Sequence, residues 1–282
     1  MVQRKYPNQP SEHPPKPGGA KKSHRPPPGR RPPRAGTPAT EGMWLYGLHP
    51  VVAALRNPDR TKLQFFATSN ALENLSAHVT SPTPAPEIRD SQQIAKLLPA
   101  AAVHQGLALR VQHLPEHDLK EVCAPHENGT PRLVVVLDQL TDPQNVGAIL
   151  RSCVAFGATA VILTGHHAPP ASGVLAKAAS GALDLIPVVR VVNLARAMEQ
   201  LAELGFWRVG LDSEASHPIA DIDLSGNIAL VLGAEGSGLR QLTARKCDFL
   251  ARIPANGQLA SLNVSNAAAI ILYEVARRRT PA

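Results

Sequence analysis

The chain is 282 residues long, with 44% hydrophobic and 18% charged residues and a formal net charge of +7. Apolar runs such as 133–137 and 267–273 are far shorter than the ~20 residues of a membrane-spanning helix, so we expect a soluble protein with no membrane segment. The sequence has three widely spaced cysteines: Cys123, Cys153 and Cys247. Their odd number and wide spacing argue against a disulfide framework. Because they form no Cys-x-x-Cys zinc motif, no metal is expected.

The first 40 residues differ in composition from the rest of the chain. They contain 11 prolines and one aromatic residue, Tyr6, which is too little apolar surface to offset the entropy lost on ordering, so 1–40 is predicted to be a disordered tail. Nine Lys and Arg residues against Glu12 give the tail a charge of +8 and leave the remaining residues at −1. A basic arm favours contact with phosphates, and a solubilising extension is the alternative. Because no signal sequence is recognisable, we expect a cytoplasmic protein.

Residues 43–111 have the pattern of a small α/β domain. The expected elements, in chain order, are a helix over 48–56, a strand over 63–67, a helix near 90–98 and a strand over 107–111. The polar stretch 123–131 resembles an interdomain connection. We therefore assign 41–112 to a small domain and 113–131 to a linker.

From residue 132 the pattern changes to a regular alternation of strands and helices. Continuous apolar runs, which are typical of parallel strands buried on both faces, predict strands at 133–137, 160–163, 186–192, 207–211 and 228–232. Amphipathic spacing predicts helices at 143–156, 194–204 and 264–278. We assign 132–282 to one α/β domain with a mostly parallel sheet.

The first segment with chemical potential follows the strand at 133–137. Asp142 and Pro143 supply a capping carboxylate and a first-turn proline for the next helix. Asn145 lies in the first turn, and Arg151 lies outside the apolar stripe, about 120° around the helix axis from Asn145. The helix alone therefore does not bring these two side chains together. A capping asparagine and a surface arginine are the alternative interpretation.

The second segment is a glycine-rich turn, Gly233-Ala-Glu-Gly-Ser-Gly238, after the strand at 228–232. Its glycines let the backbone approach a ligand closely. It lacks the Lys-Ser/Thr ending of a phosphate-binding loop, and Glu235 would repel phosphate. A carboxylate here could instead orient an arginine or attract a sulfonium cation. On this segment alone, a purely structural turn is equally consistent.

The third segment runs from Ile253 to Ala267 and leads into the C-terminal helix. Ser261, Asn263 and Ser265 supply more hydrogen-bonding groups than one helix cap requires. Capping explains one of them, and the others indicate a site.

Together, the three segments resemble the SpoU/TrmH class of SPOUT RNA 2′-O-ribose methyltransferases. The motifs of that class look like Asp-x-x-Asn-x-Gly-Ala-Ile-x-Arg, Gly-x-Glu-x-x-Gly and Ile-Pro-x-x-Gly-x-x-x-Ser-Leu-Asn-Val, and the ordered match covers about 133–279. The sequence departs from the usual pattern at Asn266 and in its long tail.

The front domain is similar to the substrate-binding domain of the 23S rRNA guanosine-2′-O-methyltransferase subgroup. Two motifs carry this similarity, Tyr46-Gly-Leu-His-Pro50 and Val103-His-Gln-Gly106. His49 and His104 within them could be functional or structural.

The resemblance implies a C-terminal trefoil-knotted SPOUT domain, preceded by a small α/β substrate-binding domain, and a homodimer built on the knot. It also implies that S-adenosylmethionine is held largely by backbone groups in the knotted loops. By carry-over, the residues that bind this cofactor are Leu232, Gly233, Ile253 and Leu262. The resemblance further implies a catalytic Arg151, with the RNA and the arginine oriented by Asn145, Glu235, Ser261 and Asn263.

Transfer of a methyl group from a sulfonium to a ribose oxygen requires close alignment and removal of the hydroxyl proton. Arginine is a poor base because its pKa exceeds ~12. Our hypothesis is that Arg151 binds phosphate and polarises the ribose oxygen, while water takes part of the proton. A role for Arg151 as the base is the alternative.

The substrate implied by the resemblance is 23S rRNA, and tRNA is not excluded. A Rossmann-type dehydrogenase is a competing interpretation, but the Gly-x-Gly-x-x-Gly motif after the first strand is missing. A non-catalytic RNA-binding protein is a second competitor, and the presence of Asn145, Arg151, Glu235 and Asn263 argues against it.

Overall fold

The computed structural model describes residues 42–126, 128–165, 168–255 and 262–279. The predicted disordered tail over 1–40 and the predicted site residue Ser261 lie outside the described residues.

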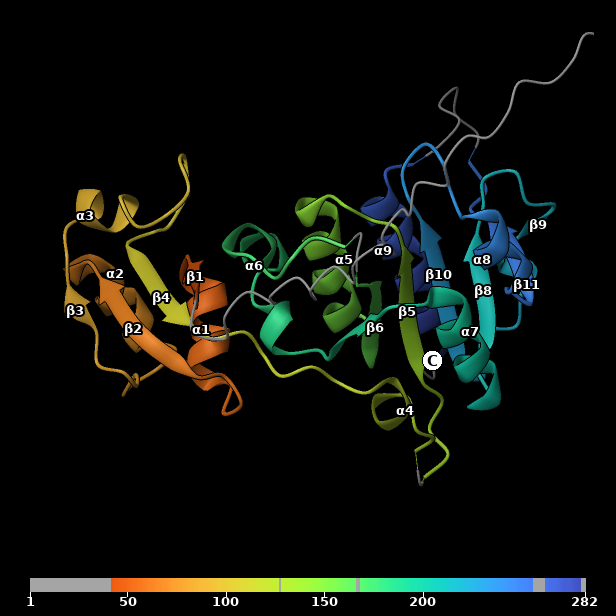
Figure 1. Cartoon of the computed structure of the whole chain (residues 1–282), viewed down its shortest axis with the longest axis horizontal. Helices are drawn as coiled ribbons and strands as arrows, with labels where there is room; N and C mark the ends of the chain where they lie inside the picture. Colours follow the sequence, from red (N-terminus) through yellow and green to blue (C-terminus); the bar gives the residue numbers. More distant parts are fainter. Residues whose placement is uncertain (1–41, 127, 166–167, 256–261, 280–282) are drawn as a thin grey trace, which may run out of the picture. The chain divides into compact units, whose positions relative to one another are not determined.

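The small domain contains a mixed four-stranded sheet in the order β1-β4-β2-β3 (Figure 1). Its strands are β1 (Met43–Tyr46), β2 (Lys62–Ala67), β3 (Glu87–Ile88) and β4 (Leu107–Val111), and its helices are α1 (Leu48–Arg56), α2 (Ser69–Ser76) and α3 (Ser91–Ala95). β4 pairs antiparallel with β1 and with β2, whereas β2 and β3 are parallel. The predicted bounds of α1 and β4 are confirmed. α3 is shorter than predicted, because a capping box at Asp90 starts it and its last turn ends before Pro99.

The large domain contains a seven-stranded sheet in the order β7-β6-β5-β10-β8-β11-β9, and every pair in it is parallel. Its strands are β5 (Leu133–Asp138), β6 (Ala160–Thr164), β7 (Val188–Val191), β8 (Trp207–Leu211), β9 (His217–Pro218), β10 (Ile228–Gly233) and β11 (Phe249–Arg252). β10 lies between β5 and β8, and its register sets Gly233 opposite Asp138. The carboxyl ends of the two central strands therefore lie side by side, where ligands of open α/β sheets bind.

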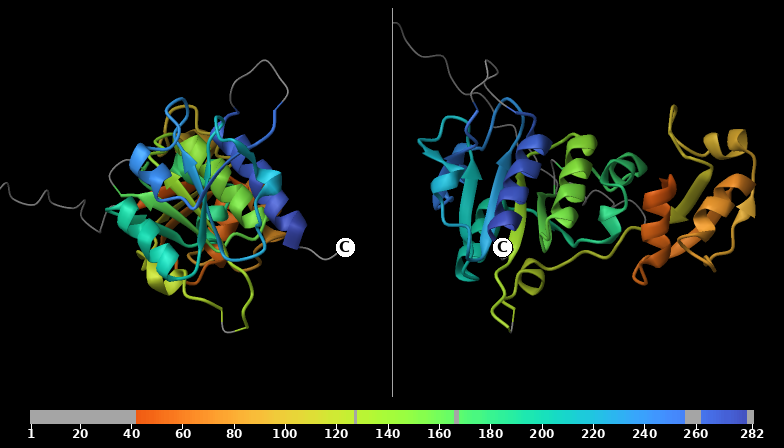
Figure 2. Two further views of the ribbon diagram at one scale, coloured as in Figure 1. Left: turned by 90° about the vertical axis from the view of Figure 1, so that its right-hand side faces the viewer. Right: turned by 180° about the vertical axis from the view of Figure 1, so that it is seen from behind.

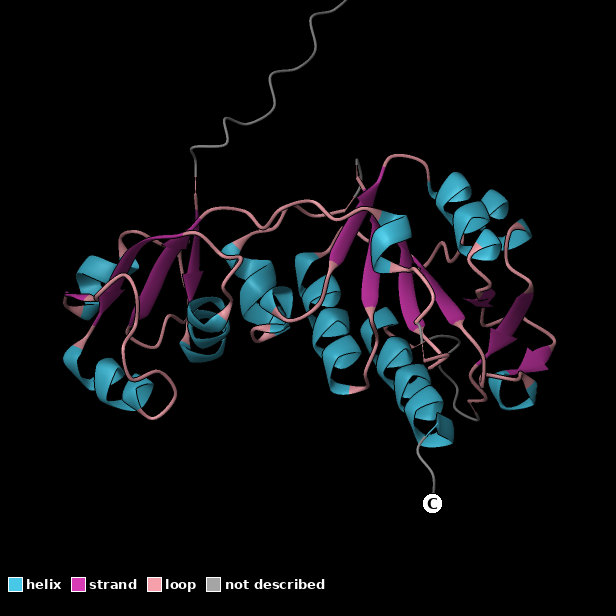
Figure 3. Cartoon of the chain, turned by 90° about the horizontal axis from the view of Figure 1, so that it is seen from below, coloured by secondary structure: helices cyan, strands magenta, loops and turns pink. Residues whose placement is uncertain are grey.

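Helices flank this sheet on both faces, as Figures 2 and 3 show. They are α4 (Leu119–Val122), α5 (Pro143–Ala155), α6 (Gly173–Ala179), α7 (Leu194–Glu203), α8 (Gln241–Arg245) and α9 (Val264–Arg279), with 3-10 turns at Ala182–Asp184 and Ile219–Asp221. Alternate residues of β5 point to opposite layers: Val135 joins a core that contains residues of α5 and α9, and Val134 joins a core that contains residues of α7. This two-sided burial explains why the strand is a continuous apolar run.

Two parts of the large domain differ from the sequence-based expectation. The strand predicted from Ile186 begins at Val188, because the Ile186 N–H donates to the Ala182 carbonyl and Pro187 has no N–H to pair. Within the predicted linker, Leu119 of α4 and Cys123, which follows this helix, are buried in the core that contains residues of α7, so this segment packs against the large domain. Among the described helices, none is long and apolar enough to cross a bilayer.

Candidate active site

The glycine-rich turn after β10 is closed tightly on itself and fixed to β5. The Gly238 N–H donates to the Ala234 carbonyl at 2.9 Å, and a Cβ added at Gly233 would lie 2.1 Å from the Gly238 carbonyl carbon. The buried carboxylate of Asp138 accepts hydrogen bonds from the backbone N–H of Arg240 at 3.2 Å and from its Nε at 2.7 Å. The turn therefore has a defined shape that depends on glycine at Gly233 and on Asp138.

Asn145, Glu235 and Asn263 meet in one hydrogen-bonded cluster, although they come from three separate segments. Asn145 Nδ2 donates to Glu235 Oε1 at 3.4 Å, and Asn263 Nδ2 donates to Asn145 Oδ1 at 3.0 Å. Asn263 Nδ2 also donates to Glu235 Oε1 in a short contact. The backbone N–H of Val264 adds a donor to the same carboxylate oxygen at 3.3 Å. One carboxylate thus holds the first, second and third motifs together.

The two asparagines differ in how their helices are capped. Asp142 caps α5 by accepting from the N–H groups of Gln144 and Asn145, so the Asn145 side chain is free to project from the helix start. Asn263 itself caps α9, since its Oδ1 accepts from the N–H of Ser265 at 2.9 Å and of Asn266 at 3.3 Å. Its amide nitrogen then remains for the cluster. Capping therefore explains Asn263, one of the three polar residues of the third motif.

A cavity of about 720 Å³ opens in front of this cluster. Its lining includes all three members of the cluster, and Ser265 and Asn266 of α9. It also includes two residues that the sequence analysis did not select as site residues, Tyr46 of β1 and Lys177 of α6. Tyr46 is part of the first front motif, Tyr46-Gly-Leu-His-Pro50. The sequence does not predict α6 as a helix, so no sequence signal points to Lys177.

Arg151 does not line this cavity. It lies on the exposed side of α5, six residues after Asn145, which corresponds to about 9 Å along the helix axis and about 120° around it. Within the described parts of the chain, the side chain of Arg151 forms no hydrogen bond or ion pair. The expectation that α5 alone would not bring Arg151 and Asn145 together is confirmed.

The four predicted cofactor residues lie at or after the carboxyl ends of parallel strands. Leu232 is buried and Gly233 ends β10, while Ile253 follows β11 directly. Leu262 precedes α9 with 44% of its surface exposed. None of the four is among the residues that line the cavity in front of the cluster, so their role in holding the cofactor stays a prediction.

The two histidines of the front motifs are not part of the cavity lining. His104 Nδ1 accepts a hydrogen bond from the Gly106 N–H at 3.1 Å, which is a structural role within its turn. The side chain of His49 is exposed. In the described residues, no group of three His, Cys, Asp or Glu side chains could hold a metal ion.

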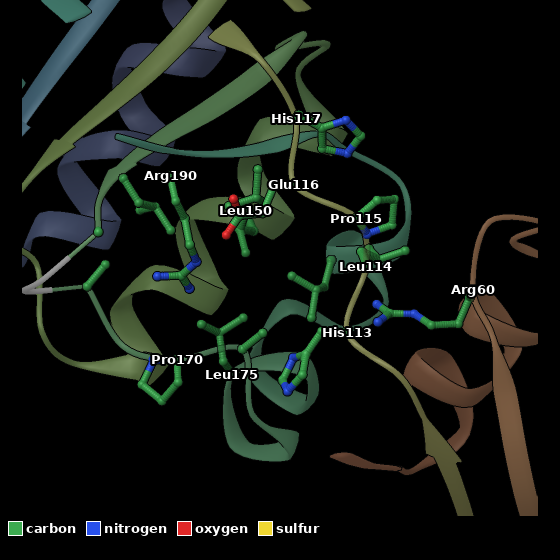
Figure 4. Close-up of a pocket in the computed structure, with 16 residues that line it drawn as sticks. Arg60, His113, Leu114, Pro115, Glu116, His117, Leu150, Pro170, Leu175 and Arg190 are labelled. Carbon is green, nitrogen blue, oxygen red and sulfur yellow. The ribbon is translucent and has the colours of Figure 1, made fainter. Parts of the chain in front are cut away.

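A second cavity of about 490 Å³ lies between residues 113–117 and the large domain (Figure 4). Its lining is mainly apolar, with Leu150 and Leu175 among its residues, and the guanidinium of Arg190 points into it. Arg190 Nη2 donates to the Pro169 carbonyl at 2.8 Å. Burial lowers the pKa of Arg190, and the charge of Glu116 opposes this shift. None of the predicted site residues lines this cavity, so the chemistry is assigned to the first one.

Comparison with known proteins agrees with this geometry. The SpoU rRNA Methylase family matches residues 132–273. The chain is 40% identical over 247 residues to the 23S rRNA (guanosine-2'-O-)-methyltransferase RlmB of Pseudomonas aeruginosa, covering 84% of this chain and 97% of that protein. With the enzyme of the same name from Vibrio parahaemolyticus, the identity is 38% over 245 residues, covering 85% and 98%.

The chain belongs to the SpoU rRNA methylase family. Among solved SpoU structures, it is similar to the SpoU methyltransferase AviRb from Streptomyces viridochromogenes in complex with AdoMet, with a TM-score of 0.71, 26% identity, and coverage of 85% of this chain and 91% of that one. It is equally similar to the AdoMet-bound rRNA methyltransferase from Sinorhizobium meliloti, with a TM-score of 0.71, 26% identity, and coverage of 86% and 89%.

SpoU membership confirms the predicted family, and the α/β fold with a mostly parallel C-terminal sheet is confirmed as well. Membership of the SpoU family also excludes the interpretation as a Rossmann-type dehydrogenase. The third motif includes 256–261, which lie outside the described residues, and the knot stays a prediction.

Proposed function

We propose that this protein transfers the methyl group of S-adenosylmethionine to the ribose 2′-hydroxyl of a guanosine in 23S rRNA. The observation that carries the proposal is the cluster of Asn145, Glu235 and Asn263 on the wall of one cavity, which joins all three SpoU motifs. Relatives with 38–40% identity over nearly their whole length are named for this reaction, which supports the same substrate here. A ribosomal substrate also supports the cytoplasm as the compartment.

In this proposal the residues that hold the cofactor are Leu232, Gly233, Ile253 and Leu262. When bound, S-adenosylmethionine supplies a methyl group activated on a positively charged sulfur. Because Gly233 follows Leu232 at the carboxyl end of the central strand β10, its backbone lies where the sheet presents unpaired polar groups to a ligand. Glu235, two residues further, brings a negative charge to the same edge, which favours a cationic donor.

The cluster orients the acceptor ribose. Glu235 Oε1 receives one donor from each of Asn145, Asn263 and the Val264 backbone, which leaves little rotational freedom to the two amides. The Asn263 amide donates to both Asn145 Oδ1 and Glu235 Oε1, so both of its N–H groups are used. Asn145 keeps its second N–H, and this remaining donor can hold a ribose or phosphate oxygen in one geometry. Rigid placement of the reacting oxygen is the main contribution that the protein makes to in-line transfer.

Arg151 supplies the positive charge for the reacting nucleotide. Its exposed position on α5 and the lack of a partner among the described residues leave the guanidinium available for an RNA phosphate. Because Arg151 does not line the cavity of its own chain, we propose that the site is completed in a homodimer. Exposed apolar residues on α9 support such an interface: Ile270 is 43% exposed, and Tyr273 is 53% exposed with its ring 6.0 Å from that of Phe156.

The two domains have different roles in this proposal: residues 41–112 bind RNA, and residues 132–282 catalyse the methyl transfer. The test incubates the purified chain with labelled S-adenosylmethionine and, in parallel, unmodified 23S rRNA, 16S rRNA and tRNA, and maps ribose methylation by mass spectrometry. Methylation of one guanosine in 23S rRNA supports the proposal. Methylation of tRNA alone, or donor and RNA binding without transfer to any RNA, would contradict it.

A further inference from the structure

The two front motifs meet at α6 of the large domain. Gln105, from the second front motif, accepts two hydrogen bonds through its Oε1 atom. One comes from the backbone N–H of Leu48 at 3.1 Å, and the other comes from Lys177 Nζ at 3.0 Å. A single side chain thus joins the start of α1 to a lysine of α6.

Glycines at both ends of α6 allow this close approach. A Cβ added at Gly173 would lie 2.4 Å from the Trp44 carbonyl oxygen and 2.7 Å from the Tyr46 ring. A Cβ added at Gly181, after the helix, would lie 3.0 Å from the His49 carbonyl oxygen, and its φ of +94° is rare for other residues. The backbone of β1 and α1 therefore packs directly against the ends of α6, which holds Lys177 beside Tyr46.

The contact places a cation on the wall of the active-site cavity. Lys177 and Tyr46 line that cavity together with Asn145, Glu235 and Asn263. Within the described ranges Lys177 forms no ion pair, and its ammonium donates to the neutral oxygen of the Gln105 amide. Burial lowers the pKa of Lys177, and no neighbouring carboxylate offsets that shift. A partly desolvated ammonium with a single neutral acceptor retains two donors for an anion.

We propose that Lys177 is a phosphate-binding residue of the active site, which holds the RNA backbone next to the ribose to be methylated, and that Gln105 positions it. This inference rests on the proposed function, since it requires an RNA strand in the cavity. A strand there carries one phosphate per nucleotide, and lysine binds phosphate as a compact charge. Tyr46 adds a neutral hydroxyl to the same cavity wall, and burial raises the pKa of this phenol further above its ordinary value. The front motifs thereby link the small domain to the catalytic cavity.

The experiment compares Lys177→Met with the wild-type chain in RNA binding at several salt concentrations, in steady-state methylation and in S-adenosylmethionine binding by calorimetry. Loss of one phosphate contact should reduce the slope of log affinity against log salt by about 1. KM for RNA should rise several-fold with little change in kcat, and donor affinity should be unchanged. Gln105→Ala should shift KM in the same direction by a smaller factor, and Lys177→Arg should restore most of the salt slope.

Lys246→Met is the matched control, because it removes the same charge from a lysine that is paired with Glu199 and does not line the cavity. Thermal melting checks that each variant is folded. An unchanged salt slope and an unchanged KM for RNA in a folded Lys177→Met variant would overturn the inference. A loss of affinity for S-adenosylmethionine would overturn it as well, because Lys177 would then bind the carboxylate of the methyl donor. A failure of the proposed function gives a different result: the wild-type chain methylates no 23S rRNA. The salt slope of RNA binding can still be measured in that case, so the two failures are distinguishable.

Discussion

Arg60 and Asp184 form an ion pair that is almost completely buried, with 1% and 2% of their side chains exposed. Arg60 Nε lies 2.8 Å from Asp184 Oδ1, and its Nη2 lies 3.1 Å from Oδ2. The third guanidinium nitrogen donates to the Gln112 carbonyl at 2.8 Å, and Asn57 Nδ2 donates to Asp184 Oδ1 at 3.1 Å. The pair joins the loop after α1 to the 3-10 turn after α6, so it ties the small domain to the segment that follows α6.

Removing one partner of this pair should be strongly destabilising. Asp184→Leu leaves a buried guanidinium without its carboxylate, Arg60→Met leaves a buried carboxylate without its guanidinium, and in each the free energy of unfolding should fall by about 3–5 kcal/mol. The double variant Arg60→Met, Asp184→Leu should lose less than the sum of the single variants, because neither charge is left unpaired. Urea denaturation of the three variants measures this coupling. Single and double variants whose losses simply add would show that the two residues do not interact.

Gly233 should not tolerate a side chain. In Gly233→Ala the new Cβ would lie 2.1 Å from backbone of Gly238, so the turn has to open and the predicted cofactor site changes shape. S-adenosylmethionine binding, measured by calorimetry, should be lost. Gly165→Ala is the control, because its Cβ would lie 3.5 Å from the nearest atom, which is ordinary contact. Wild-type donor affinity in folded Gly233→Ala would refute this account of the turn.

Glu235 should act through geometry more than through binding. Glu235→Gln keeps the shape of the side chain but replaces the carboxylate that three donors share, so the orientation of Asn145 and Asn263 relaxes. The single-turnover rate of methylation should fall about 100-fold, the size of effect expected from a misplaced reacting group. Glu199→Gln, on an exposed pair away from the cavity, is the control. A variant rate within twofold of the wild-type rate would remove Glu235 from the mechanism.

The three thiols should be unreactive in the folded chain. Burial raises the pKa of Cys123 to about 11, and it raises the pKa of Cys153 and of Cys247 to about 12. A raised thiol pKa means that the folded state favours the protonated, unreactive form, and folding stability falls only as the pH rises above the ordinary thiol value. Iodoacetamide at pH 8 should modify the native chain slowly and the urea-unfolded chain quickly. Equal rates in both states would contradict this burial.

Elements with a clear apolar pattern were predictable from the sequence, whereas short elements without such a pattern were not. The bounds of α1, β4 and β8 follow from their mainly apolar patterns, and they agree with the structure. α6 consists of seven residues, four of them Gly or Ala, so it has no strong amphipathic signal. The short strands β9 and β11 were not predicted for a similar reason, since two to four residues carry no period.

The candidate site was predictable in its chemistry but only partly in its geometry. The spacing of Asn145 and Arg151 on one helix predicted their separation, which the structure confirms. The meeting of Asn145, Glu235 and Asn263 came from the family resemblance, because these residues are up to 118 positions apart. Lys177 and Tyr46 could not be found in this way, since their proximity depends on how the two domains pack at Gly173 and Gly181.

The most direct test of the central claim is the transfer of labelled methyl groups to unmodified 23S rRNA by the wild-type chain and by Arg151→Ala, with S-adenosylmethionine affinity measured on the same samples. We predict 2′-O-methylation of one guanosine by the wild type. In Arg151→Ala the rate should fall by about 100-fold or more, as for loss of a transition-state charge contact, with donor affinity retained. Undiminished transfer by Arg151→Ala would contradict the proposed role of the arginine, and a wild-type chain that binds the donor but leaves 23S rRNA unmodified would contradict the account as a whole.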